Sequence, residues 1–91
     1  MQWRASHILV KDRALAERLL KDLKGGARFE VIAKEHSTCP SKNKGGDLGW
    51  FGSGQMVKEF EAAVSRMGTG SLSSIVRTQF GFHIIKKTGQ K

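Results

Sequence analysis

The sequence contains little that ties it to an oxidising compartment or to a membrane. Its 91 residues include one cysteine, Cys39, one proline, Pro40, and no tyrosine. A single cysteine cannot form a disulfide within the chain, and the N-terminal segment has no apolar stretch of signal-peptide length. No hydrophobic run is long enough to cross a membrane. We therefore expect a protein without membrane spans, located in the reducing cytoplasm.

Acidic residues are also scarce. Eight Asp and Glu oppose 16 Lys and Arg, which gives a formal net charge of +8 and suggests attraction to nucleic acid, acidic peptide or a membrane surface. The basic residues are spread from Arg4 to Lys91, however, without a run of five like charges or an arginine-rich helix. A solvated basic surface is the expectation, and a nucleic-acid-binding protein is kept as an alternative.

Composition and length indicate one globular domain over residues 1–91. Hydrophobic residues make up 38% and charged residues 26%, which is ordinary for a folded protein and unlike the composition of disordered chains. No repeat, linker or low-complexity tract divides the chain. We expect a single domain that acts as a monomer.

The spacing of hydrophobic residues predicts an α+β fold. The segment from Gln2 to Val10 is apolar on both faces of a strand, so it is expected at the centre of a sheet. Along the chain, the predicted elements follow the order strand, helix, helix, strand, helix, strand, strand. This order favours a small, mainly antiparallel sheet packed on helices. The other predicted elements are a helix capped by Asp12 and ending near Lys24, a helix over 28–36, a strand in "DLGWF", a helix from Met56 or Val57 to Arg66, and strands over 75–78 and 82–87 joined by a turn at Phe80 and Gly81.

Residues 45–56, "GGDLGWFGSGQM", combine five glycines with large apolar side chains. The glycines favour tight turns and close backbone approach. Leu48 follows from the predicted strand, and Met56 and Phe60 are four residues apart on one predicted helical face. The three side chains are therefore expected to form an apolar concavity, with an ordinary core layer as the alternative.

Three residues could carry polar chemistry. His7 and His83 both lie in predicted strands, and if those strands are neighbours the two imidazoles share a face and can hydrogen bond. The alternative is two separate core histidines. Cys39 lies in a loop, where it is either a reactive thiol or a small packed side chain.

Two other site classes are disfavoured. A zinc site would need more than the single doublet in "HSTC", formed by His36 and Cys39. A thiol hydrolase would need an oxyanion hole and an orienting residue, which no motif supplies. We expect no metal and no cofactor.

Taken together, the motifs resemble those of the parvulin-type peptidyl-prolyl cis-trans isomerases. The resemblance rests on "SHILV", "GGDLGWFGSGQMVKEFE" and "TQFGFHIIK", in that order, and extends from about Ala5 to Lys87. It is greatest to the short stand-alone parvulins of bacteria and archaea. It implies a four-stranded antiparallel sheet with about three to four helices, and a cofactor-free rotation of X-Pro peptide bonds in flexible polypeptides.

The resemblance also implies which residues form the site. Catalytic roles fall on His7, Cys39, Thr78 and His83, and substrate binding falls on Leu48, Gln55, Met56, Phe60 and Phe80. We expect one of Trp50 and Phe51 to anchor its strand in the core and neither to contact substrate. The hypothesis for catalysis is noncovalent stabilisation of the twisted amide; covalent attack by Cys39 is the alternative.

One departure from the family bears on specificity. Phosphate-directed parvulins carry a long basic loop after the first strand, whereas here "VKDRALAE" passes almost directly into a helix, with Lys11 and Arg13 as isolated basic positions. We therefore predict no requirement for a phosphorylated residue before proline. A peptide-binding chaperone module with little catalysis is the remaining alternative.

Overall fold

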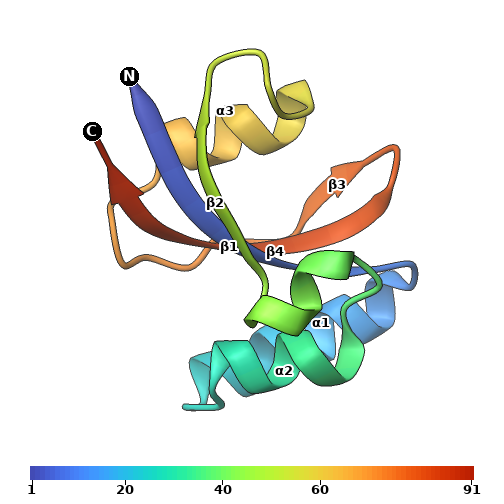
Figure 1. The fold of residues 1–91 in the computed structure, drawn as a ribbon. Helices are drawn as coiled ribbons and strands as arrows, with labels where there is room; N and C mark the ends of the chain where they lie inside the picture. The colour runs from blue at the N-terminus through green and yellow to red at the C-terminus, as the bar shows by residue number, and fades with distance from the viewer.

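Two long strands form the centre of the molecule in the computed structural model, which describes residues 1–91. Strands β1 (Gln2–Val10) and β4 (Gly81–Gln90) lie antiparallel side by side, with β2 (Asp47–Gly52) beyond β1 and β3 (Val76–Thr78) beyond β4. All three pairings in the order β2-β1-β4-β3 are antiparallel (Figure 1). The predicted α+β fold with a four-stranded antiparallel sheet is confirmed.

Helices cover both faces of the sheet. In Figure 1, α1 (Arg13–Lys24) and α2 (Phe29–His36) lie below the sheet, and α3 (Lys58–Arg66) lies above it. A short 3-10 helix, η1 (Pro40–Lys44), begins where the sequence predicted only a loop. The Asp12 side chain accepts a hydrogen bond of 3.1 Å from the Ala14 backbone N–H, so it caps α1 as expected.

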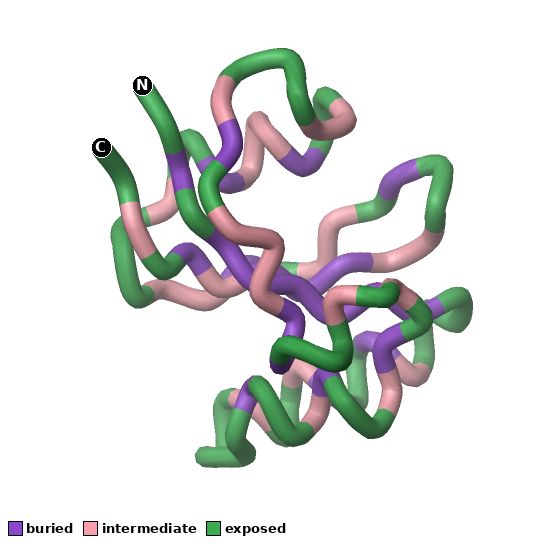
Figure 2. Tube along the Cα trace, in the orientation of Figure 1, coloured by how far each residue is buried: buried purple, intermediate pink, exposed green.

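The alternation of β1 divides the core into two layers. Ile8 and Val10 pack toward α1 and α2, whereas Trp3 and Ala5 pack toward α3 and Phe51. All four side chains are buried, and the run of buried residues along β1 is visible at the centre of Figure 2. The prediction of a central strand that is apolar on both sides is therefore confirmed.

The start of α3 differs from the sequence prediction. The helix begins at Lys58, so Met56 and Val57 precede it, and its first hydrogen bond runs from Glu61 N–H to the Val57 carbonyl at 3.1 Å. Val57, the N-cap residue, has a φ of −60° and a ψ of 150°, which lies outside the helical region and keeps Met56 out of the helix. Placing Met56 and Phe60 on one helical face was therefore wrong, although both side chains reach the same cavity.

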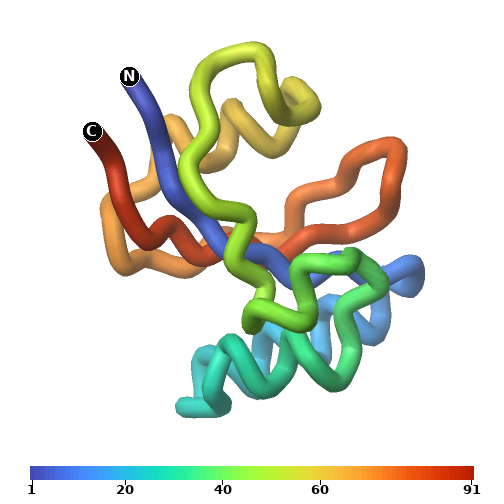
Figure 3. Tube along the Cα trace, viewed as in Figure 1, coloured from blue at the N-terminus to red at the C-terminus, as the bar shows by residue number.

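The last two strands also differ in extent from the prediction. Gln79 and Phe80 form the turn, and β4 starts at Gly81 and runs to Gln90 rather than ending at Lys87. The extension pairs with the start of β1, where Gln2 N–H donates to the Lys91 carbonyl at 2.6 Å and Lys91 N–H donates to the Gln2 carbonyl at 2.8 Å. The two ends of the chain therefore lie side by side (Figure 3).

A charged residue occupies the layer under α3. Lys87 is only 1% exposed, and its ammonium group donates hydrogen bonds to the Met67 carbonyl at the end of α3 and to the Gln90 side chain. The lysine thus ties the C-terminal end of α3 to β4.

Among the helices of the chain, none has the length and apolar character that a membrane crossing needs.

Candidate active site

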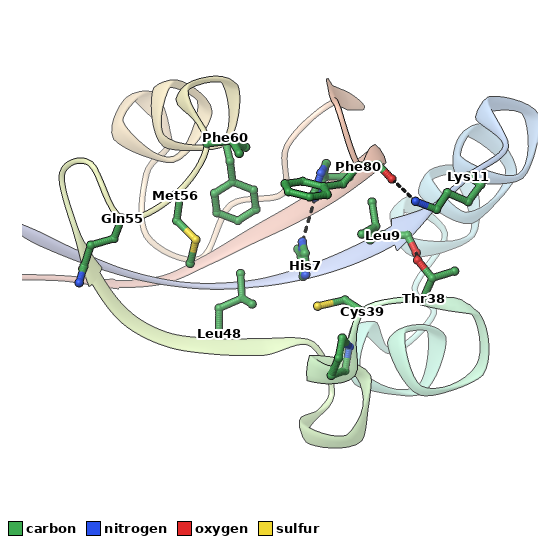
Figure 4. A pocket seen from close by; sticks show the side chains of 13 residues that line it. His7, Leu9, Lys11, Thr38, Cys39, Leu48, Gln55, Met56, Phe60 and Phe80 are labelled. Atoms are coloured by element: carbon green, nitrogen blue, oxygen red, sulfur yellow. Dashed lines mark hydrogen bonds between the residues drawn. The ribbon is translucent and has the colours of Figure 1, made fainter.

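A cavity of about 570 Å³ opens between α3, η1 and the β3–β4 turn. Its walls come from segments far apart in the sequence, which the sheet brings together (Figure 4). All the predicted site residues except Thr78 line it: His7, Cys39, Leu48, Gln55, Met56, Phe60, Phe80 and His83. Five further lining residues were not predicted as site residues: Leu9, Lys11, Thr38, Pro40 and Val57.

The strand register brings the two histidines into contact. In the β1–β4 pairing Leu9 faces His83, and His7 faces Ile85, which makes the two imidazoles diagonal neighbours on the α3 face. Their Nδ1 atoms are 2.9 Å apart, and the rings stack with centroids separated by 5.1 Å. The prediction that both imidazoles share one face and hydrogen bond is confirmed.

Thr78 completes a hydrogen-bond chain behind the histidines. Its hydroxyl oxygen is 2.6 Å from His83 Nε2 and accepts a hydrogen bond of 3.1 Å from the Phe80 backbone N–H. One of the two facing Nδ1 atoms carries a proton and donates to the other, so hydrogen bonds link the Thr78, His83 and His7 side chains in either tautomer. His7 Nε2 is buried and has no hydrogen-bond partner in the chain.

Burial keeps both imidazoles neutral. His7 and His83 are 5% and 3% exposed. Desolvation, followed by the charge of His83, lowers the pKa of His7 to about 4. Desolvation, followed by the charge of Lys11, lowers the pKa of His83 to about 4. Both imidazoles are therefore uncharged near neutral pH.

An apolar wall stands next to this polar pair. Phe60 is 2% exposed and presents its ring edge-on to His7 and to His83, with centroids 5.6 Å away in both cases. Leu48 and Met56 are half-buried, pack against the same core layer as Phe60, and line the cavity (Figure 4). The expected concavity is present, because these residues leave one side open instead of closing a core layer.

Hydrogen bonds to β1 hold Cys39 at the opposite wall. The Thr38 backbone N–H donates to the Leu9 carbonyl at 2.8 Å, and the Leu9 N–H donates to the Ser37 hydroxyl at 3.0 Å. Ser37 is 3% exposed and was missed in the sequence analysis, because its partner lies 28 residues away on β1 and no local pattern indicates such a bond. Cys39 itself is half-buried, and no hydrogen bond links its thiol to either histidine.

The glycine-rich stretch lets its backbone approach β1 closely. Gly46 has a φ of +92°, its carbonyl accepts the His7 N–H at 2.9 Å, and a Cβ there would lie 2.5 Å from the His7 carbonyl oxygen. Phe51, at 3% exposed, is the residue that anchors β2 in the core. Trp50 is exposed and does not line the cavity. The Lys91 ammonium nitrogen lies over its ring, 4.4 Å from the ring centroid.

Two side chains at the rim are already partly engaged. The Gln55 side-chain oxygen accepts the Gly52 backbone N–H, which leaves its amide N–H groups free to donate to a ligand carbonyl. The Lys11 ammonium donates to the Phe80 carbonyl at 2.6 Å and so fixes the turn that carries Phe80. Leu9 lies two residues after His7 in β1, so both side chains point to the same face of the sheet. This alternation could have identified Leu9 as a lining residue from the sequence.

Metal ligands do not converge in this chain. No group of three or more His, Cys, Asp and Glu side chains is placed to hold an ion. His36, the partner of Cys39 in the "HSTC" doublet, lies 3.8 Å from the Glu35 carboxylate instead and does not line the cavity.

Comparison with known proteins identifies the class to which this fold and site belong. The family model of the rotamase, or PPIC-type PPIase, domain matches residues 7–89. The chain therefore belongs to the PPIC-type peptidyl-prolyl cis-trans isomerase family, and the family resemblance found in the sequence is confirmed.

Individual relatives include longer and shorter proteins. The foldase protein PrsA of Bacillus subtilis is 54% identical over 89 residues, which are 97% of this chain and 30% of that protein. PrsA of Bacillus anthracis has a crystal structure with a TM-score of 0.97 and 48% identity, covering 99% of this chain and 42% of that one. NmPin, the parvulin of Nitrosopumilus maritimus, has a TM-score of 0.85 and 40% identity, covering 97% of this chain and 96% of that one. The chain spans about 30% of the length of its curated PrsA relatives.

Proposed function

We propose that this domain accelerates cis-trans rotation about X-Pro peptide bonds in flexible polypeptides and thereby assists protein folding. Rotation about a peptide bond faces a barrier of about 18–20 kcal/mol, because resonance gives the C–N bond double-bond character. Uncatalysed X-Pro exchange takes tens to hundreds of seconds. No bond is cleaved, so the domain needs neither a cofactor nor a nucleophile for this reaction.

The observation that carries the proposal is the apolar recess beside the buried histidine pair. A proline ring presents only hydrocarbon, and Leu48, Met56 and Phe60 offer an apolar surface on which it can lie. Membership of the PPIC-type family and similarity to foldase proteins support the same reaction.

The mechanism follows from the geometry around that recess. The planar amide is stabilised by charge separation that water solvates, so an apolar site destabilises it relative to the twisted state. The neutral His7–His83–Thr78 chain provides fixed dipoles at the wall that stabilise the twisted amide electrostatically. The free N–H groups of Gln55 can hold a substrate carbonyl while the bond turns.

Isomerisation of a proline-containing tetrapeptide, followed by NMR exchange or by a protease-coupled assay, tests this proposal. Phe60→Ala and Met56→Ala remove the proline surface, and we expect each to lower kcat/KM by about tenfold or more, because a few methylene-sized contacts contribute roughly 1–3 kcal/mol. Met67→Ala is the matched control for Met56→Ala, since both side chains are half-buried against the same core layer but Met67 lies outside the cavity. If the wild-type domain does not accelerate exchange, the proposed function is wrong.

We also propose that catalysis does not require phosphate before proline. The Lys11 ammonium is engaged by the Phe80 carbonyl, and Arg13, itself largely exposed, forms an ion pair of 3.1 Å with Glu17. Both isolated basic groups thus already have partners. Matched peptides with phosphoserine, Glu, Leu or Ala before proline test the proposal, and a large preference for phosphoserine would contradict it.

We further propose that the protein is located in the cytoplasm and acts as a monomer. The unpaired thiol of Cys39 supports the location, and the size and single-domain pattern of the chain support the monomeric state. Cell fractionation tests the first, and sedimentation of the purified protein tests the second.

A further inference from the structure

A carboxylate on α3 ties down the turn that forms one rim of the cavity. Glu61 Oε1 accepts the Gly54 backbone N–H at 2.7 Å, and Glu61 Oε2 accepts the Ser53 hydroxyl at 3.1 Å. Glu61 directly follows Phe60, whose ring contacts both histidines. One turn of α3 therefore carries both the apolar wall of the cavity and the carboxylate that fixes its rim.

Among residues 53–55 no other hydrogen bond joins the turn to the rest of the fold, whereas Gly52 is the last residue of β2 and pairs with Gln2 of β1. Within residues 52–55, Gly52 N–H donates to the Gln55 side chain, and Gln55 N–H donates to the Gly52 carbonyl at 3.3 Å. Ser53, Gly54 and Gln55 are all exposed. The internal bonds define the shape of the turn, and only the two bonds to Glu61 attach it to a helix. Without them, residues 53–55 would be held only by the chain on either side, so we expect them to be more mobile relative to the cavity.

We propose that Glu61 is a positioning residue for substrate binding, which sets Gln55 and Met56 against the proline recess. This inference rests on the proposed function. The carboxylate pre-orders the rim, so that a bound peptide does not have to immobilise it. The histidine pair is held by Thr78 and by the strand register, without contact to the turn. Glu61 should therefore affect peptide binding far more than the chemical step.

The test compares Glu61→Ala with Glu61→Gln and with Glu59→Ala. Glu59 lies two residues away on α3, is exposed and makes no side-chain hydrogen bond, so it controls for loss of charge near the helix start. For Glu61→Ala we expect KM, and the Kd of a proline-containing tetrapeptide measured by NMR, to rise about fivefold to tenfold, because two solvent-exposed charge-assisted bonds are lost. The kcat should stay within about twofold of wild type.

The other variants distinguish positioning from general stability. Glu61→Gln keeps one oxygen that can accept the Gly54 N–H, so most of the affinity should return, and Glu59→Ala should bind like wild type. Amide hydrogen exchange at Gly54 should accelerate in Glu61→Ala alone.

Loss of kcat at unchanged KM, unchanged peptide affinity in Glu61→Ala, or an equal effect of Glu59→Ala would each overturn the inference. If the wild type binds the peptide without accelerating exchange, the proposed function fails while the Kd comparison still decides the role of Glu61. If the wild type does not bind the peptide, both fail.

Discussion

Acid should destabilise this fold through its buried histidine pair. Both pKa values are lowered from 6.5 to about 4 in the folded state, so the unfolded chain binds more protons between these values. The contribution of the two neutral imidazoles to the free energy of unfolding is complete well above pH 6.5. This contribution is lost as the pH falls from 6.5 toward 4. For one imidazole, this shift lowers the free energy of unfolding by roughly 2 kcal/mol between pH 7 and pH 5. For His7 and His83 together, the loss is about 4 kcal/mol, a large part of the stability of a small domain.

The measurement is urea unfolding at pH 7 and at pH 5, with NMR titration of the histidine ring signals in the folded protein. A loss of this size corresponds to a Tm decrease of roughly 15–30 °C for a domain of this length. In the double variant His7→Gln/His83→Gln, the difference in the free energy of unfolding between pH 7 and pH 5 should be smaller by about 4 kcal/mol. The variant His36→Gln, which changes only the histidine outside the cavity, should retain most of this difference.

Two results would refute this reasoning. One is a pair of titrations for His7 and His83 near 6.5, which would mean that burial does not restrain protonation. The other is a stability difference between pH 7 and pH 5 below about 1 kcal/mol, with the two states unfolding reversibly. The NMR titration decides the question even where the double variant does not fold.

Three further predictions concern individual positions. Thr78→Val removes the hydroxyl that hydrogen bonds to His83 and should lower kcat about tenfold, whereas Thr78→Ser should restore it; equal activities of wild type and Thr78→Val would contradict a role for this hydrogen bond. Cys39→Ser should keep activity within about tenfold in the isomerisation assay, and a loss of a thousandfold or more would favour covalent attack. Gly46→Ala should destabilise the fold by at least about 2 kcal/mol in urea unfolding, because its φ is positive and its Cβ would strike the His7 carbonyl oxygen. Gly54→Ala should lower the free energy of unfolding by less, because Gly54 has a positive φ but open space around its Cα. A larger loss for Gly54→Ala than for Gly46→Ala would contradict the close approach of Gly46 to β1.

Much of the fold could be predicted because its elements have clear periodicity. Strand β1 is apolar on both faces, and the helices show caps and stripes, so the order of elements and the α+β class followed from local patterns. The contact between His7 and His83 was predictable only on the assumption that their two strands are neighbours. Alternation placed His7 and His83 on faces of two strands, but the pairing of β1 with β4 depends on packing between residues about 76 positions apart.

Other features depend on contacts that leave no local signal. Met56 has helical spacing relative to Phe60, yet the non-helical backbone of the N-cap residue Val57 keeps it outside α3. Lys87 looks like one more surface lysine among many, but it is buried because the end of α3 offers it a carbonyl. Charge and spacing describe what a residue can do, whereas only the fold determines its neighbours.

The paired ends of the chain have a practical consequence for how this domain can be handled. The bonds between Gln2 and Lys91 close one end of the two central strands, while Lys11 and Gly81, at the other end of those strands, adjoin the cavity and its turn. A tether, a fluorescent label or a fusion partner attached at either terminus would therefore sit away from the cavity mouth. Joining the termini with a few flexible residues would give a cyclic domain, in which the unfolded chain has less entropy and the recess stays open to a passing polypeptide.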